Sequence, residues 1–212
     1  MFVYIVMATA AYLLGSIPTG YLAARAKGID IRTVGSGNIG ATNAFRILGK
    51  PAGIFVLVAD GLKGFAACAW LADFVIQLFA AAPEQKENLR IVAGICAVLG
   101  HNFTCWLKFK GGKGIATSAG VYFALAPLAA GISLGTWIIV FALGRFVSVA
   151  SIAAAVALPV AVWLTSGSRF LGIVTTALGL LAIYKHKSNI QRLLNGTERR
   201  LGQKSVTQEA TK

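Results

Sequence analysis

The chain alternates long apolar runs with short polar stretches that are rich in lysine and arginine. A helix that crosses a bilayer needs about 20 apolar residues. These runs lack the regular polar stripe of an amphipathic surface helix. The pattern therefore predicts an all-α integral membrane protein, whose clearest spans cover residues 2–24, 52–71, 89–106, 146–164 and 170–184.

A further stretch, residues 114–143, has no charge and is interrupted by Pro127 and Gly131. Its thirty residues suit either one tilted span or two short ones. Two spans place the N-terminus outside, the C-terminus in the cytoplasm, and 16 of the 20 lysines and arginines on the cytoplasmic side. One span would place the basic C-terminal tail outside, against the positive-inside rule. We therefore predict seven transmembrane helices.

The apolar runs leave too few residues for a separate soluble domain, so we expect one membrane domain, residues 1–202, and a disordered tail, residues 203–212. Basic residues follow the first apolar run instead of preceding it, which favours a retained helix over a cleaved signal peptide. Residues 185–202 are expected to form a short amphipathic helix on the cytoplasmic surface, with its apolar side chains turned to lipid: Ile190, Leu193, Leu194 and Leu201.

Composition agrees with a membrane protein, because 57% of residues are hydrophobic and only 13% are charged. The net charge of +13 fits positive-inside bias, attraction to anionic lipid, and an anionic substrate. Nucleic acid is excluded as a partner, since little water-facing surface remains for a basic binding face. The three cysteines lie in or beside apolar runs and are interpreted as core residues.

The segment KFKGGKGIATSAG, residues 108–120, combines lysines and glycines between two apolar runs. Glycine allows backbone N–H groups to turn toward a ligand, and a helix starting near Lys113 would direct its positive dipole end to the same place. Both features favour a phosphate site. A basic loop that only satisfies membrane orientation is the alternative. The segment is not a Walker A loop, because Gly114 follows Lys113.

A second polar segment, TVGSGNIGATNAFR at residues 33–46, contains a G-x-G-x-x-G pattern. No strand precedes it, so we reject a dinucleotide site. Its hydrogen-bonding side chains favour contact with a ligand over a turn whose polar groups bond only to one another.

In the second apolar run, Asp60 and Lys63 are three residues apart and share a helix face. Ionisable groups at this depth in a membrane are costly, and we favour a functional role for Lys63.

No general base or metal site is evident. His101 and His186 lack the acidic residue of a His-x4-Asp motif, because Trp106 and Gln191 occupy that position. Carboxylates on the predicted cytoplasmic side are too scattered to pair on Mg²⁺. What remains is a basic site able to bind two anions and to stabilise charge that develops on a carbonyl oxygen or a departing phosphate.

Three segments together, GSGNIGATNAFR, HNFTCWLKFKGGKGIAT and HKSNIQRLLNGTE, resemble the signature motifs of bacterial membrane acyl-phosphate:glycerol-3-phosphate acyltransferases. The resemblance implies transfer of an acyl group from an acyl phosphate to the 1-hydroxyl of glycerol 3-phosphate, giving lysophosphatidic acid and inorganic phosphate. It implies no cofactor or metal and no use of acyl-CoA or acyl-carrier protein. It also implies an active site on the cytoplasmic face of the bacterial inner membrane, and we expect a monomer.

The resemblance also assigns residues. It implies catalytic roles for Ser36, Lys113, His186 and Asn189. It also implies substrate contacts, to which we add Lys63 because of its depth in the membrane and Arg145 and Ser148 because of the predicted topology. The expected contacts are Asn38, Thr42, Asn43, Arg46, Lys63, His101, Gly111, Gly112, Gly114, Thr117, Arg145, Ser148 and Glu198. Within that set, the three glycines and Lys113 are expected to bind glycerol 3-phosphate, and the third motif to position substrate.

Because an acyl phosphate is already activated, we hypothesise that its own phosphate accepts the glycerol hydroxyl proton, so that no protein base is needed. Two alternatives stay open. Seven spans and intramembrane charges also suit a transporter of an organic phosphate or lipid, although internal repeats are absent and the motifs cluster on one face. A membrane-anchored regulatory partner of lipid enzymes would show no turnover.

Overall fold

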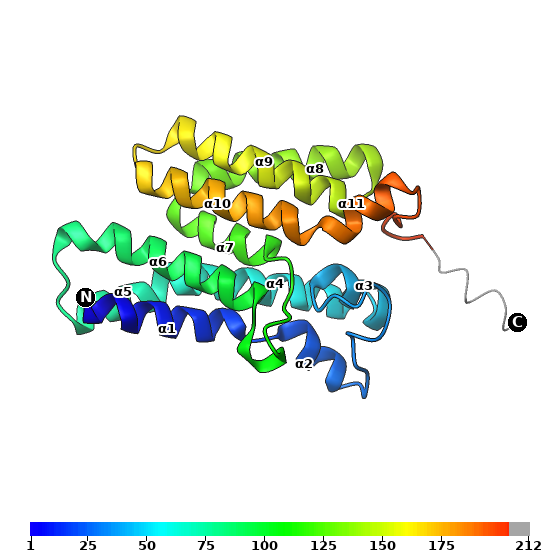
Figure 1. The fold of residues 1–212 in the computed structure, drawn as a ribbon, viewed down its shortest axis with the longest axis horizontal. Coiled ribbons are helices and arrows are strands. Elements are labelled where there is room, and N and C mark those ends of the chain that lie inside the picture. The colour runs from blue at the N-terminus through cyan, green and yellow to red at the C-terminus, as the bar shows by residue number, and fades with distance from the viewer. Residues whose placement is uncertain (204–212) are drawn as a thin grey trace, which may run out of the picture.

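A computed structural model describes residues 1–203, and these residues contain helices and loops but no strand. Most helices lie roughly along one axis (Figure 1). In chain order they are α1 (Phe2–Ser16), α2 (Thr19–Arg25), α3 (Ala41–Leu48), α4 (Lys50–Ala66), the π-helical turn η1 (Ala67–Leu71), α5 (Ala72–Leu78), α6 (Pro83–Asn102), the 3₁₀ turn η2 (Cys105–Leu107), α7 (Ile115–Leu125), α8 (Pro127–Gly144), α9 (Val147–Thr165), α10 (Arg169–Lys185) and α11 (Lys187–Leu194).

Five helical segments of the described chain are long and apolar enough to cross a membrane: Phe2–Arg25, Lys50–Leu78, Pro83–Leu107, Pro127–Gly144 and Val147–Thr165. The prediction of an all-α membrane fold is therefore confirmed. The uncharged stretch at 114–143 is divided at Ala126, as predicted, but α7 has only 11 residues. With 17 residues, α10 is also shorter than those five.

The first predicted span is broken near its middle. Helix α1 ends at Ser16 and α2 begins at Thr19, on either side of Pro18. Proline has no N–H to donate, and its ring disfavours helical geometry in the residue before it. The carbonyl of Ile17 lies between the two helices, where it accepts from the backbone N–H of Thr19 at 3.1 Å and from the ammonium group of Lys63 at 2.8 Å.

The second span extends beyond its predicted end at residue 71. The helix continues through η1 and α5 to Leu78, because residues 74–76 are apolar. Asp73 does not end it, since its carboxylate pairs with the guanidinium group of Arg90 on α6 at 2.5 Å. The connection to α6, residues 79–82, is consequently short.

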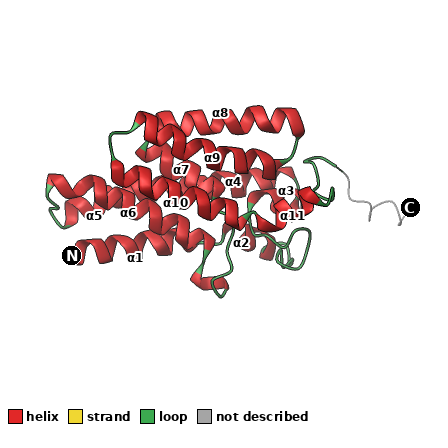
Figure 2. Cartoon of the chain, turned by 45° about the horizontal axis from the view of Figure 1, so that its top comes forward, coloured by secondary structure: helices red, strands yellow, loops and turns green. Residues whose placement is uncertain are grey.

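Small residues allow the helices to approach closely. A Cβ added to Gly100 of α6 would overlap the backbone of α1, and one added to Gly120 of α7 would overlap the backbone of α4. Membrane helices associate largely through such close packing, since burial of apolar surface gives little driving force in lipid. Figures 1 and 2 show α2, α3 and α11 at the end of the bundle opposite the N-terminus.

The amphipathic helix predicted for residues 185–202 is wrong in its extent. Helix α11 ends at Leu194, and Gly196, with φ of 68°, reverses the chain behind it. Leu201 consequently lines a cavity inside the protein instead of facing lipid. Of the tail predicted to be disordered, residues 204–212 lie outside the described residues.

Candidate active site

Two cavities meet at Lys113. The larger, here called the groove, has a volume of about 460 Å³ and extends from the motif residues to an apolar interior. The smaller, here called the glycine pocket, has a volume of about 330 Å³ and is lined by Asn38, Phe103, Gly111, Gly112, Lys113, Tyr184, Lys185, Lys187 and Ser188. Among residues 1–203, only Asn38 and Lys113 border both. The two cavities therefore offer neighbouring sites for two ligands.

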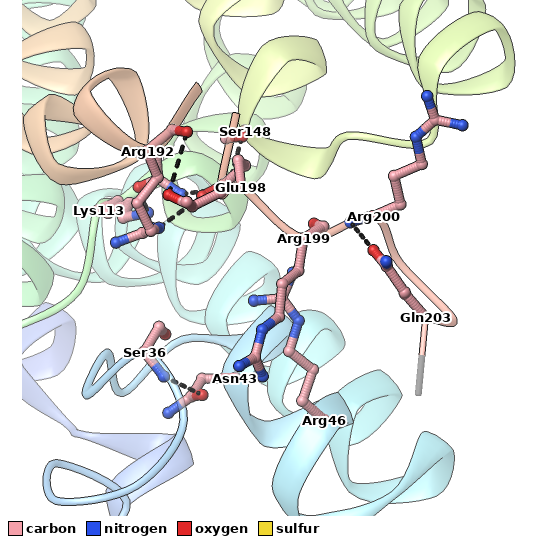
Figure 3. A network of polar contacts seen from close by, with 12 residues as sticks. Ser36, Asn43, Arg46, Lys113, Ser148, Arg192, Glu198, Arg199, Arg200 and Gln203 are labelled. Atoms are coloured by element: carbon pink, nitrogen blue, oxygen red, sulfur yellow. Dashed lines mark hydrogen bonds and ion pairs between the residues drawn. The ribbon is translucent and has the colours of Figure 1, made fainter. Parts of the chain in front are cut away.

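The first motif is folded around the buried amide of Asn43. Its nitrogen donates to the carbonyls of Ile31, Val34 and Asn38, and its oxygen accepts from the backbone N–H of Ser36 (Figure 3). A buried amide that is fully hydrogen-bonded fixes the loop around it. The loop thereby presents the side chains of Ser36 and Asn38 to the groove.

The second motif closes against the C-terminal end of α6. The N–H of Gly111 donates to the carbonyl of Asn102, and that of Gly112 to the carbonyl of His101. Helix ends leave such carbonyls without partners, which explains this direction. The expectation that these two amides turn toward a ligand is therefore wrong, and glycine is needed for another reason: a Cβ on Gly112 would overlap the ring of His101.

Helix α7 supplies the predicted positive helix end instead. Gly114 has φ of 81° and precedes the first residue of the helix, Ile115. Gly114, Ile115 and Ala116 all line the groove. The first amides of a helix and its dipole favour a bound anion, so a phosphate next to Lys113 would meet both charge and backbone donors.

The third motif is joined to the second through side chains. The ammonium group of Lys113 donates to the side-chain oxygen of Asn189, whose nitrogen donates to the Glu198 carboxylate at 2.7 Å. Glu198 also accepts from Ser148 of α9 at 2.8 Å and from Arg192 at 2.7 Å (Figure 3). The reversal at Gly196 brings Glu198 to this position. The network fixes Lys113 at the junction of the cavities.

Burial shifts the pKa values of two side chains at this site. Burial lowers the pKa of Lys113 to about 8, which the carboxylate of Glu198 opposes and the guanidinium groups of Arg192 and Arg46 reinforce. Burial, together with the charge of Lys113, lowers the pKa of His186 to about 4. Its Nδ1 lies 2.8 Å from the carbonyl of Ala182. If Nδ1 carries the proton there, Nε2 of the neutral ring is a hydrogen-bond acceptor.

The pKa values of Arg46 and Glu198 are also shifted. Burial lowers the pKa of Arg46, whose guanidinium donates to the carbonyl of Arg199 at 3.0 Å. Burial works against ionisation of Glu198, but its hydrogen bonds from Asn189, Ser148 and Arg192 keep the pKa of the carboxyl below its usual value. The network around Lys113 therefore places the Glu198 carboxylate among several cations.

Below the site lies a buried charged cluster on α4 and α6. The Lys63 ammonium is 2.8 Å from the carboxylate of Asp60, which also accepts from Thr19 at 3.1 Å. Nδ1 of His101 lies 3.6 Å from the same carboxylate, beyond hydrogen-bond distance. Asp60 and His101 line the groove.

Most predicted site residues are gathered by the fold. Around the groove lie Ser36, Asn38, Thr42, Asn43, Arg46, His101, Lys113, Gly114, Ser148, His186, Asn189 and Glu198, and around the glycine pocket lie Gly111 and Gly112. Lys63, Thr117 and Arg145 line neither cavity. Sequence reasoning missed Arg192, Lys185 and Lys187, whose signal was their position within or beside the third motif.

No three His, Cys, Asp or Glu side chains among residues 1–203 lie close enough together to form a metal site. The side chains that the fold gathers around Lys113 suit anion binding, hydrogen bonding and positioning. A basic polar end that continues into an apolar groove suits a ligand with a phosphate and a long hydrocarbon chain.

Comparison with known proteins agrees with this arrangement. The chain is 50% identical to a glycerol-3-phosphate acyltransferase of Geobacter metallireducens over 201 residues, covering 94% of this chain and 98% of that protein. It is 44% identical to one of Geotalea daltonii over 195 residues, covering 92% and 95%.

Two solved structures of PlsY (YgiH), an integral membrane glycerol 3-phosphate acyltransferase, are also similar. The glycerol 3-phosphate form has a TM-score of 0.84 at 37% identity and covers 99% of both chains. The lysophosphatidic acid form has a TM-score of 0.81 at 38% identity and covers 94% of this chain and 95% of that one. Residues 5–196 match the family model described as glycerol-3-phosphate acyltransferase, and the chain belongs to that family.

Proposed function

We propose that this protein transfers the acyl group of an acyl phosphate to the 1-hydroxyl of glycerol 3-phosphate, giving lysophosphatidic acid and inorganic phosphate. The observation that carries the proposal is the continuity of the groove, which joins Lys113, His186 and Asn189 to an apolar interior between α7, α8, α9 and α10. An acyl phosphate has the same division into an anionic head and an apolar chain. The related PlsY structures bear glycerol 3-phosphate and lysophosphatidic acid in their names.

The two cavities suggest how the substrates divide. The glycine pocket is polar and has three lysines in its wall, Lys113, Lys185 and Lys187. It suits glycerol 3-phosphate, while the groove suits the acyl chain. Lys113 then lies between the two phosphates. Its positive charge offsets the repulsion between the two anionic substrates when they are brought together.

In the reaction, the 1-hydroxyl oxygen of glycerol 3-phosphate attacks the carbonyl carbon of the acyl phosphate. The bond from that carbon to the phosphate oxygen breaks, and inorganic phosphate leaves with the hydroxyl proton. His186 supports this route, because a pKa of about 4 makes its ring a weak base at neutral pH. A hydrogen bond to its neutral ring is sufficient to orient the hydroxyl group.

We further propose that the protein is a monomer with seven transmembrane helices in the bacterial inner membrane, with α7 and α10 added to the five longer spans. The N-terminus lies outside and the site faces the cytoplasm, where glycerol 3-phosphate is available. The distribution of lysine and arginine supports this orientation. Neither acyl-CoA nor acyl-carrier protein is needed, because the acyl phosphate is already activated.

The test uses purified protein in lipid nanodiscs with palmitoyl phosphate and glycerol 3-phosphate, in buffer without Mg²⁺. Phosphate and lysophosphatidic acid should appear in equal amounts, and palmitoyl-CoA should not replace the donor. Lys113→Ala should lower the formation of both products by about 10²–10³. Lys110→Ala is the matched control, since Lys110 is an exposed lysine of the same loop that lines neither cavity. Binding of glycerol 3-phosphate without turnover would favour the transporter alternative.

A further inference from the structure

The groove has a closed inner end. Tyr122 of α7 and Ala130 of α8 line it, and both also belong to a tightly packed hydrophobic core with Val121, Ala161 and Val162. Tyr122 is 1% exposed and Ala130 is 4% exposed. Because both residues are packed into that core, the groove borders the packed interior of the protein at these two positions.

One side of the groove is open to the surroundings of the protein. Ile54 and Leu57 of α4 line it and are 47% and 52% exposed, and Leu134 of α8 lines it and is 44% exposed. An acyl chain can therefore enter sideways from the bilayer between α4 and α8. Only its far end meets the closed wall.

The distance from the polar end to this wall matches one lipid chain. On α9, Ser148 belongs to the hydrogen-bonded network and Leu158 lies near the inner end of the groove. Ten residues of α-helix rise about 15 Å, half of the roughly 30 Å thickness of a bilayer hydrocarbon core. An acyl chain anchored by its phosphate thus reaches the wall with its terminal carbons.

We propose that Tyr122 and Ala130 determine the length of the acyl chain that this enzyme transfers. The proposal rests on the function proposed above. It follows from the position of both residues at the closed end and from the fixed position of the reacting group at Lys113. A chain that is too long must bend out toward lipid, and one that is too short leaves the wall without contact.

The hydroxyl group of Tyr122 can be removed while the aromatic ring is kept. Within the described residues the buried hydroxyl has no hydrogen-bond partner. Removing a buried hydroxyl that has no partner costs little. Tyr122→Phe therefore keeps the wall, whereas Tyr122→Ala opens space beyond it and Ala130→Leu fills the last part of the groove.

The test is a competition experiment in nanodiscs with equal amounts of myristoyl, palmitoyl, stearoyl and arachidoyl phosphate. Mass spectrometry of the lysophosphatidic acids gives the relative kcat/KM values from the product ratios. One methylene in an apolar pocket changes such a ratio by about tenfold or more. Tyr122→Ala should shift the products toward longer chains and Ala130→Leu toward shorter ones, each by about tenfold.

Tyr122→Phe should retain the wild-type product ratio. Ala142→Leu is the matched control for added bulk, because Ala142 is exposed on α8 and lies outside the groove. If Tyr122→Ala does not fold, Ala130→Leu still tests the wall from the other side. Unchanged ratios in active variants would overturn this inference alone. Wild-type protein that uses none of the four donors would overturn the proposed function and this inference with it.

Discussion

Lys113 donates a hydrogen bond to the side chain of Asn189, although 76 positions separate the two in the chain. This contact joins the second motif to the third and aims the ammonium group between the two cavities. A charge held in place before substrate binds needs little reorganisation as charge develops in the reaction. Asn189 therefore acts with Lys113 as one unit.

The unit can be tested with a double-mutant cycle. Lys113→Ala should lower kcat/KM for glycerol 3-phosphate by about 10²–10³, as is typical when one charge-stabilising donor is removed. Asn189→Ala should cost less, and the double variant should be no worse than Lys113→Ala, because groups that act as a unit are not additive. Initial rates of lysophosphatidic acid formation measure this, with exposed Asn195→Ala as the control. Additive losses would show independent roles.

Glu198 fixes the C-terminal segment to α9 and α11. Its carboxylate accepts from three donors and its side chain is 5% exposed. Glu198→Ala should destabilise the protein by about 1.5–3 kcal/mol, the range for a hydrogen bond to a charged group. The contribution is present at neutral pH and is lost as the pH falls through the lowered pKa of this carboxyl.

Thermal unfolding in detergent measures this effect. Glu87→Ala on α6 is the matched control, because Glu87 is exposed. Glu198→Gln should retain the contacts from Ser148 and Asn189 and lose the ionic contact with Arg192. Its stability should therefore lie between that of the wild-type protein and that of Glu198→Ala. Equal unfolding temperatures for the wild-type protein, Glu198→Gln and Glu198→Ala would contradict the role of Glu198.

The pH dependence of the reaction distinguishes a titration of Lys113 from a titration of either histidine. With a pKa of about 8, Lys113 is protonated at neutral pH and loses its charge as the pH rises through 8. The phosphate of glycerol 3-phosphate has its second pKa near about 6 and does not change in that range. We expect kcat/KM to fall with an apparent pKa near 8, and this limb to disappear in Lys113→Arg, since arginine stays protonated.

His186→Ala and His101→Ala should lower activity but leave the limits of the pH profile in place. For His186 the reason is its pKa of about 4, which keeps the ring neutral throughout the working range. If the acyl phosphate accepts the proton, neither ring has to gain one. A pH–rate limb that disappears with either substitution would contradict the proposed route.

Much of the site was predictable because charge and motif composition constrain topology. Residues 33–46, 101–118 and 185–199 are polar segments beside apolar runs, and the predicted topology brings them to one membrane face. Most residues that the structure gathers around Lys113 were named from these segments and from their family resemblance, but Arg192, Lys185 and Lys187 were not. Helix α7 also begins where the glycines predicted it.

Other features depend on contacts that no local pattern reveals. Whether the amide of Gly112 points to a ligand or to α6 depends on carbonyls at the end of another helix. The direction of Lys63 depends on the break at Pro18, more than 40 residues away in the chain. Gly196 ends α11, although Thr197 to Leu201 continue an amphipathic pattern, because the carboxylate of Glu198 gains three donors by turning back.

Asp60 and Lys63 form a buried ion pair that should behave as a single neutral unit. They are 3% and 7% exposed. Removing one partner leaves the other charge buried, which typically costs about 3–5 kcal/mol, whereas replacing both is often neutral. Asp60→Asn and Lys63→Met should each lower the unfolding temperature, and the double variant should recover most of the loss.

Activity in the double variant then separates two roles for Lys63. The ammonium group donates to the carbonyl of Ile17 and lines neither cavity. We therefore expect the double variant to recover kcat/KM for glycerol 3-phosphate together with stability, because Lys63 supports the break between α1 and α2 and neither residue lines the glycine pocket proposed for that substrate. Recovered stability with a KM that stays high would instead assign Lys63 to substrate binding. A double variant as unstable as either single variant would contradict the neutral pair.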